Sequence, residues 1–348
     1  MTRSPAPLSR RALMARLPRC GALAAALLAP ALLALSPSAQ AQSPAFPSRP
    51  ITLLVPYPAG GGADALARAL QPAMSKALGQ PVVVENVSGA GGSLGVQRLL
   101  AAPADGHTIM VGSPNEVILA PLSMQSAGYR PEQLRMLAPI SSNPLVVFAR
   151  KDLPANSIDE LVALARKNEA TPISFGSIGH GSMYHIVAEY FGQLAGLKLL
   201  HVPYKGTTPL VQDLAGQQID FAVLPNLGLP TQMLESGRLK ALTIMDSHRM
   251  PTLPKVGTTA ESQVPHKEEL LQAVWAAVLV RADVPEAAAR VLLKAAQQGI
   301  ASPETAKVLE PSGVQALPPA PLEQTATFYR QEIAKFQAMA RSIKLSPR

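Results

Sequence analysis

The feature that most constrains the fold is a unit of strand, glycine-rich loop and helix that occurs twice. In the first copy, the apolar strand 51–55 leads into the loop 56–64 and then into a helix. In the second copy, the strand 173–175 is followed by the loop 176–182 and a helix from about Met183. Strands that alternate with helices indicate parallel α/β sheets, whose ligands gather at the carboxyl ends of the strands. The pattern predicts an α/β fold with two similar loops at one sheet edge.

Both loops have the composition of an anion site. Neither 58–63 nor 177–182 contains lysine or arginine, so a carboxylate there would depend on backbone N–H groups, hydroxyls and helix dipoles. Glycine leaves the N–H groups uncovered, and a helix start adds roughly half a positive charge. A tight turn that needs glycine only for its geometry explains the first loop equally well. The residues alone leave both interpretations open.

The first 41 residues have the pattern of an export signal. Five arginines precede an apolar run, and Ala39-Gln40-Ala41 forms a cleavage motif before Gln42. The run, Cys20 to Leu35, has 16 residues, whereas a membrane span needs roughly 20. Ser9-Arg10-Arg11 also resembles a twin-arginine signal, so the general and the twin-arginine export routes both stay open. We expect cleavage near Ala41 and a mature protein outside the cytoplasm.

Cleavage removes most of the positive charge. The leader holds five of the 31 basic residues and none of the 23 acidic ones, so the formal net charge falls from +8 to +3. We therefore expect no nucleic-acid partner. The mature chain of 307 residues contains no cysteine, which suits an oxidising compartment and excludes disulfides and thiolate chemistry. Its length allows two domains.

The order of the motifs resembles the substrate-binding proteins of tripartite tricarboxylate transporters, the Bug family. The motifs are VPYPAGGGAD at 55–64, ENVSGAGG at 85–92, ADGHT at 104–108, SIGHGSMYH at 177–185, HVPYKG at 201–206 and GRLKAL at 237–242. The resemblance covers most of the mature chain. It implies a type II periplasmic-binding-protein fold, in which two α/β lobes hold a small carboxylated ligand in the cleft between them.

The resemblance also implies lobe boundaries and partners. Lobe 1 would comprise 42–141 plus 247–348, lobe 2 would comprise 142–246, and the hinges would lie near Leu145 and Ala241. The ligand would be a small organic acid, such as a dicarboxylate that bridges both helix starts. A periplasmic monomer would then pass it to integral membrane subunits of a tripartite transporter. A ligand-sensing role for a signalling receptor is the alternative among binding proteins.

The ligand-binding residues implied by the resemblance come from the two loops and from the strand after the second helix. They are Tyr57, Ala59, Gly60, Gly61, Gly62, Asp64, Ser177, Gly179, His180, Gly181, Ser182, Tyr204 and Lys205. Ser113, Asn143 and Asn226 follow strands and are weaker candidates. An asparagine, Asn226, stands where the family usually has an aspartate, which loosens the identity of the ligand.

Several of these residues also have purely structural explanations. Asp64 suits the N-cap of the first helix better than a ligand contact, because aspartate there would repel an anion. His180 would add a charge to the second loop when protonated, or it is simply exposed to solvent. His185 and Glu189 stand four residues apart on a helix, but no third residue has helpful spacing. We expect no metal and no cofactor.

One segment also fits a secreted serine hydrolase. Gly91-Gly92-Ser93-Leu94-Gly95 matches G-x-S-x-G between a strand and a helix, and Asp220 with His248 or His266 would complete the chain order of a triad. Ser93 comes early in the mature chain, however, after a single strand-loop-helix unit. The sequence therefore favours a binding protein over an enzyme.

Overall fold

The computed structural model describes residues 46–347, apart from 168–169 and 315. The chain divides into two compact units, Met1–Ala45 and Phe46–Arg348, and the second unit is described here. The expected leader and its cleavage site at Ala41 lie outside the described residues. Within the described part, no helix is both long enough and apolar enough to cross a membrane.

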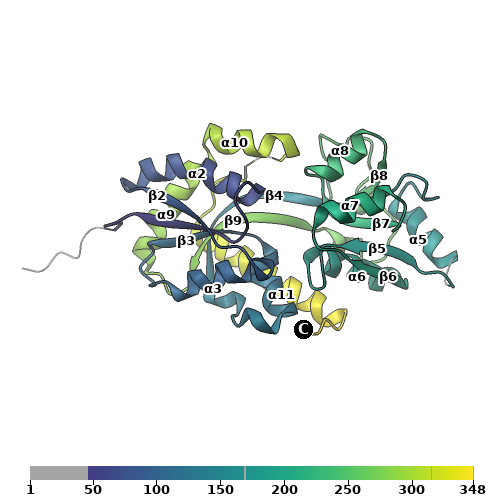
Figure 1. Ribbon diagram of the computed structural model, residues 1–348, viewed down its shortest axis with the longest axis horizontal. Helices are drawn as coiled ribbons and strands as arrows, with labels where there is room; N and C mark the ends of the chain where they lie inside the picture. Colours follow the sequence, from purple (N-terminus) through teal and green to yellow (C-terminus); the bar gives the residue numbers. More distant parts are fainter. Residues whose placement is uncertain (1–45, 168–169, 315, 348) are drawn as a thin grey trace, which may run out of the picture. The chain divides into compact units, whose positions relative to one another are not determined.

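Nine strands of the described part belong to one sheet, which has two halves joined at β4 (Figure 1). The order is β2-β1-β3-β9-β4-β7-β5-β6, and β8 pairs with β4 outside this path. The strands are β1 Ile51–Val55, β2 Val82–Asn86, β3 Thr108–Gly112, β4 Leu134–Arg150, β5 Ile173–Ser177, β6 Leu199–Pro203, β7 Phe221–Pro225, β8 Leu239–Ile244 and β9 Ala273–Arg281.

Each half contains a parallel group of three strands. In the first half β1 pairs in parallel with β2 and β3, and in the second half β5 pairs in parallel with β6 and β7. Between these groups, β4 and β9 run antiparallel to their neighbours. The fold is therefore mixed α/β, and the parallel groups place the carboxyl ends of β1 and β5 in front of the two glycine loops.

The long strand β4 belongs to both halves. It pairs with β9 from Leu134 to Pro144 and with β7 from Leu145 onward. The sequence predicts a strand only over 145–150, because Pro139 and Pro144 interrupt its first part. The structure accommodates that part with two register shifts against β9, which is how sheets tolerate proline.

The predicted hinge positions occupy different surroundings. Leu145 marks the point where β4 changes partner, and its backbone also bonds to Met245 and Gln272 at 2.7 and 2.9 Å. Ala241 lies inside β8, opposite Phe148. Met245 and Gln272 therefore lie beside the point where β4 changes partner, and hinge motion at Leu145 or Ala241 stays a prediction.

Helices lie on both sides of the sheet (Figure 1). They are α2 Gly62–Leu78, α3 Ser93–Ala101, α4 Ala120–Ser123, α5 Ile158–Lys167, α6 Met183–Ala195, α7 Thr207–Ala215, α8 Leu229–Glu235, α9 Glu286–Ile300, α10 Pro303–Leu309 and α11 Leu322–Ser342. A five-residue π-helix, η2 Asn115–Leu119, leads directly into α4. The sequence predicts a helix over 158–167, and α5 has these bounds. Ser157 accepts a hydrogen bond from the Glu160 N–H at its start.

Alternation along β1 divides the first core between two faces. Ile51, Leu53 and Val55 belong to one buried cluster with α2 and α9, whereas Leu54 points to the other cluster. On α2 the buried Leu70 and Met74 continue one apolar face across Pro72, so the helix is not broken there, although the sequence predicts a kink or a break.

The single tryptophan of the chain lies near the point where β4 changes partner. Trp275 of β9 pairs with Ser142 of β4, and its indole N–H donates to the buried Glu332 of α11 at 2.9 Å. Phe328 and Tyr329 contact the ring edge-on, each with centroids 6.2 Å away. This packing fixes α11 against the crossing strands.

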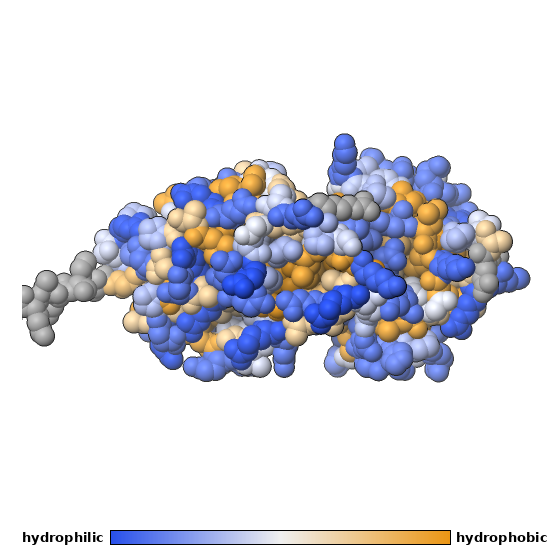
Figure 2. Space-filling view, turned by 90° about the horizontal axis from the view of Figure 1, so that it is seen from below, coloured by the Kyte–Doolittle hydropathy of each residue, from blue (hydrophilic) through white to orange (hydrophobic). Residues whose placement is uncertain are grey.

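Polar residues cover most of the face seen in Figure 2, with separate apolar areas among them. The exposed large hydrophobic residues of the described part are likewise spread over different elements. They are Val83, Leu94, Leu200, Leu227 and Val291. Isolated exposed residues of this kind are ordinary on protein surfaces and indicate no docking face.

Candidate functional site

The first glycine loop joins β1 to α2 and is open to solvent. Its N-cap is Gly61, so α2 begins at Gly62 and not near Ala65. Gly60 has φ +83°, which favours glycine, and a Cβ atom at Gly60 or Gly62 would meet nothing within 4 Å. The first N–H groups of a helix have no partner inside the helix. Here they belong to an exposed stretch, 58–62, as the anion-site interpretation requires.

Asp64 lies in the first turn of α2, so the N-cap expectation is wrong. Its buried carboxylate accepts hydrogen bonds from the Gly60 N–H and the Arg68 Nε, both at 2.9 Å, and from Asn86 at 3.0 Å. These partners, Arg68 first, lower the pKa of Asp64 to about 2. One loop N–H is therefore already used by an internal carboxylate, and Arg68, which the sequence analysis missed, stands at the characteristic i,i+4 spacing.

The second glycine loop joins β5 to α6 and is held by its own hydroxyls. Ser177 ends β5 fully buried, and its Oγ bonds to the Gly179 backbone and to His201 at 2.7 Å. Ser182 is the N-cap of α6, accepts from the His185 N–H and donates to the Gly179 carbonyl at 2.8 Å. Both hydroxyls proposed for ligand binding thus support the loop in this conformation.

The second loop also packs against the connection between β3 and β4. The Met183 N–H, at the start of α6, donates to Asn115 Oδ1 at 3.2 Å. A Cβ atom on Gly181, whose φ is +75°, would lie 2.0 Å from Ser123 Cβ. Only glycine allows this approach, and the contact joins elements from the two halves of the sheet.

Three histidines, from the second loop, α6 and β6, lie against one another. His180 and His185 have ring centroids 4.9 Å apart, and His185 stacks on His201 at 4.1 Å. His185 Nδ1 accepts the Gly181 N–H at 3.1 Å, and Glu189 lies 3.9 Å from Nε2. Among the described residues, no group of three or more His, Cys, Asp or Glu side chains is arranged to hold a metal.

His180 borders a polar cavity of about 320 Å³. His185 and Glu189 of α6 line the same cavity, and the segment 343–346 after α11 closes its other side. His180 therefore faces the end of α11 as well as its own loop.

Tyr204 and Lys205 follow β6 beside the second loop. The Tyr204 N–H donates to the Ser177 carbonyl at 2.8 Å, which places both residues at the carboxyl edge of the second half. The Tyr204 hydroxyl donates to Asp213 at 2.9 Å, and burial together with Asp213 raises the pKa of Tyr204 to about 12. Lys205 is exposed.

Ser113 was a weaker candidate, but its partner Glu116 of η2 was not predicted as a site residue. Its carboxylate is fully buried and accepts hydrogen bonds from the Tyr57 hydroxyl and the Ser113 hydroxyl, each at 2.7 Å, and from the Ser113 N–H. Burial raises the pKa of Glu116. Burial, and next the charge of Glu116, raise the pKa of Tyr57. The signal that could have identified Glu116 is the run of polar residues directly after the buried strand β3, which lies next to β1 in the sheet.

The hydrolase alternative does not assemble. Ser93 is 1 % exposed, and its Oγ has no hydrogen-bond partner among the described residues. Asp220 bonds instead to Arg150 at 2.9 Å and to the Ser174 hydroxyl at 2.8 Å. The two candidate bases lie beside other carboxylates, His248 beside Asp246 at 3.6 Å and His266 beside Glu269 at 3.5 Å, so the predicted triad is not formed.

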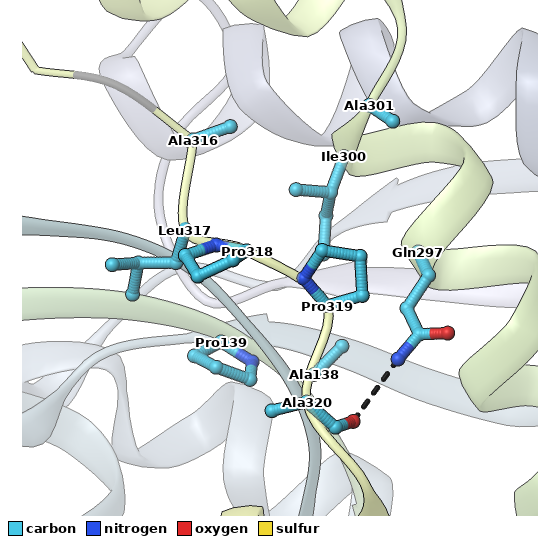
Figure 3. A pocket seen from close by; sticks show the side chains of 10 residues that line it. All are labelled: Ala138, Pro139, Gln297, Ile300, Ala301, Ala316, Leu317, Pro318, Pro319 and Ala320. Carbon is cyan, nitrogen blue, oxygen red and sulfur yellow. Dashed lines mark hydrogen bonds between the residues drawn. The ribbon is translucent and has the colours of Figure 1, made fainter.

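A second cavity, of about 220 Å³, lies between β4, α9 and the segment 316–320 (Figure 3). Its lining is mainly aliphatic, with Ile300 and Leu317 among the side chains drawn, and Gln297 donates to the Ala320 carbonyl at 3.0 Å. The described lining contains none of the predicted site residues and does not suit an anion.

Comparison with known proteins identifies relatives along nearly the whole described chain. The family model described as "Tripartite tricarboxylate transporter family receptor" (TctC) matches residues 66–345. The periplasmic binding protein BugD is 30 % identical, with TM-score 0.70 over 87 % of this chain and 100 % of its own.

Two solved structures from Rhodopseudomonas palustris carry ligands. MatC with bound malate is 26 % identical, with TM-score 0.70 over 84 % of this chain and 99 % of its own. The Rpa4515 protein with adipate is 27 % identical, with TM-score 0.72 over 87 % of this chain and 100 % of its own. The match confirms a periplasmic-binding-protein fold and a binding protein in place of an enzyme. This chain belongs to the TctC, or Bug, family of tripartite tricarboxylate transporter receptors.

Proposed function

We propose that this receptor binds a small dicarboxylate or related organic acid in the periplasm and delivers it to the membrane subunits of a tripartite transporter. The acid would lie between lobe 1 (42–141 plus 247–348) and lobe 2 (142–246). The chain would act as a monomer after removal of its leader near Ala41. No metal or cofactor takes part.

The observation that carries the proposal is the uncovered start of α2. Gly61 and Gly62 leave their main-chain N–H groups uncovered, whereas the Gly60 N–H donates to Asp64. The Asp64–Arg68 pair leaves no isolated negative charge to repel an anion. The relatives with malate and adipate support a short dicarboxylate. The second carboxylate would reach the start of α6, where Ser182, Gly181 and His180 lie.

Binding of the second carboxylate at the start of α6 requires a hydrogen bond between α6 and η2 to break. Asn115 already accepts the Met183 N–H, so a ligand oxygen would replace the amide oxygen there. Tyr204 and Lys205 lie beside this position, and Lys205 supplies the nearest exposed positive charge of the predicted set. This exchange of hydrogen-bond acceptors favours release of the acid as well as its capture, because the Met183 N–H bonds to Asn115 again when the acid leaves.

The test is a thermal-shift screen of the mature protein, 42–348. Malate, adipate, a monocarboxylate and a tricarboxylate are compared with the matched amides, which keep the shape and lose the charge. A ligand that binds only the folded state stabilises it by about 2.7 kcal/mol at a hundredfold excess over Kd. We expect a shift for the dicarboxylates and none for the amides. Equal shifts with acids and amides would contradict the proposal.

A further inference from the structure

The segment after β3 contacts both glycine loops. From η2, Glu116 accepts a hydrogen bond from Tyr57 of the first loop, and Asn115 accepts one from Met183 at the start of α6. Ser123, at the end of α4, contacts Gly181. A π-helix within a helix is frequent at functional positions. The segment is therefore placed to respond to a ligand at either loop.

Glu116 lies in surroundings built for a carboxylate. Tyr57 and Ser113 give its two oxygens three donors, two hydroxyls and one backbone N–H. The side chain is fully buried, and a buried charge is costly even when it is hydrogen-bonded. The three donors stabilise the negative charge of Glu116, but a second anion nearby would raise its free-energy cost.

The hydrogen bond from Tyr57 creates a conflict for an anionic ligand. A tyrosine has a single O–H donor, and here it points to Glu116 Oε2 at 2.7 Å. A ligand carboxylate beside the Tyr57 hydroxyl would meet oxygen lone pairs, with the Glu116 charge behind them. Protonated Glu116 would instead donate to the Tyr57 oxygen, and the Tyr57 O–H would turn to the ligand.

We propose that Glu116 takes up one proton from solvent when an organic acid binds beside Tyr57, which frees the Tyr57 hydroxyl to donate to the acid. The inference rests on the proposed function, since it concerns the same site. Glu116 is a positioning residue that acts on the ligand through Tyr57. Its protonation lets the cleft accept a dianion without two adjacent buried negative charges.

The neighbours of Glu116 favour this proton uptake. The charge of Glu116 raises the pKa of phenols from four surrounding elements, Tyr57, Tyr129, Tyr184 and Tyr329. The helix α3, which packs against η2, carries one basic residue, Arg98, and its half-exposed side chain pairs with Glu85 at 3.5 Å. The neighbouring segments 90–92 and 120–123 contain no ionisable residue. Burial raises the pKa of Glu116, and its hydrogen bonds only partly offset the increase. A ligand anion nearby would raise the pKa of Glu116 further, because like charges disfavour the ionised form.

The experiment is calorimetric titration of the mature protein with malate, or with adipate if malate gives no heat, in two buffers of different ionisation enthalpy. The difference between the heats gives the protons taken up per ligand. The matched variant is Glu116→Gln, whose amide N–H donates to the Tyr57 oxygen as protonated Glu116 would. Tyr57→Phe removes the hydroxyl and keeps the ring.

For the wild type we expect net proton uptake and an affinity that weakens by up to about tenfold per pH unit once Glu116 is ionised in the free protein. Glu116→Gln should bind with no uptake and with an affinity independent of pH, and Tyr57→Phe should bind more weakly and also without uptake. Thermal melting of each variant checks that it is folded.

Two outcomes would overturn the inference and leave the proposed function intact: malate or adipate binds the wild type without uptake, or the uptake persists in Glu116→Gln. In the second case another group, such as His180 or His185, takes up the proton in place of Glu116. If neither acid nor any other carboxylate binds the wild type, the proposed function itself fails, and the inference fails with it.

Discussion

The two glycine loops follow the same sequence pattern but differ in how the protein uses them. The loop before α2 is open, and a charged pair, Asp64 with Arg68, fixes it from one side. The loop before α6 is tied down by Ser177 and Ser182 and docked against Ser123. A glycine-rich strand-to-helix turn can therefore either stay open to solvent or form a contact between halves of the protein. Substitutions can separate the two uses.

The largest effect is expected for Gly181→Ala. Its Cβ would lie 2.0 Å from Ser123 Cβ, and overpacking of this kind costs about 1–3 kcal/mol in addition to about 1–2 kcal/mol for the left-handed backbone. Urea unfolding measures the loss. Gly179→Ala is the matched control, because Gly179 also has positive φ but faces open space. Equal losses in the two variants would mean that the contact with Ser123 does not matter.

Gly61→Val tests the open loop. Gly61 has φ −79° and a Cβ atom there would lie 3.5 Å from the nearest oxygen, so the fold should tolerate valine. The side chain would cover the N–H groups of the loop, and we expect ligand affinity to fall at least tenfold, about 1.4 kcal/mol. Titration with malate or adipate measures the affinity, and Gly61→Ala should show a smaller loss. Unchanged binding would move the site elsewhere.

Ser182→Ala tests the tied loop. Ser182 caps α6 through its side chain, and loss of such a cap costs about 1 kcal/mol. Ser182→Asp restores an acceptor and should recover most of the stability while weakening anion binding by charge repulsion. Urea unfolding and ligand titration are measured together. If Ser182→Asp bound the acid as tightly as the wild type, the start of α6 would not face the ligand.

The smallest effect is expected for the contribution of Asp64 to stability at low pH. The pKa of Asp64 is lowered in the folded protein, to about 2, so its stabilising contribution is complete above the unfolded pKa of about 3.9 and is lost as the pH falls toward 2. Arg68 is half-exposed, and solvent screens the pair. Asp64→Asn should therefore melt slightly below the wild type at pH 6, with the gap closing in acid. If the difference in melting temperature stayed constant with pH, the shape of the Asp64 side chain and not its charge would stabilise the fold.

Local patterns predicted most of the fold, whereas contacts between distant residues did not follow from them. The bounds of β1 and α5 agree with the sequence, and α11 ends at Ser342, as the amphipathic pattern over 323–342 predicts. Apolar periodicity and end signals coincide in these elements. The first part of β4 was missed because its prolines disrupt the alternation of a strand. A strand that changes sheet partner is stabilised by both neighbours, and no local signal records that.

The same limit applies to the site. The two loops were found from their glycines, but Glu116 was not, because one glutamate after Pro114 is unremarkable until the fold places it under Tyr57. The hydrogen bond from Met183 to Asn115 joins residues 68 positions apart. Ser177 and Ser182 were expected to face a ligand; in this conformation their hydroxyls bond to groups of the protein, and a ligand contact stays a prediction. Hydroxyl groups beside glycines serve either role, and only the three-dimensional neighbours show which one applies.

The placement of Trp275 gives the unlabelled protein a built-in optical probe. Because the chain contains one tryptophan, its fluorescence originates from a single position, where β9 runs beside β4 and α11 holds the indole through Glu332. Emission intensity and quenching then report on the strands that join the two halves, without dyes or engineered cysteines.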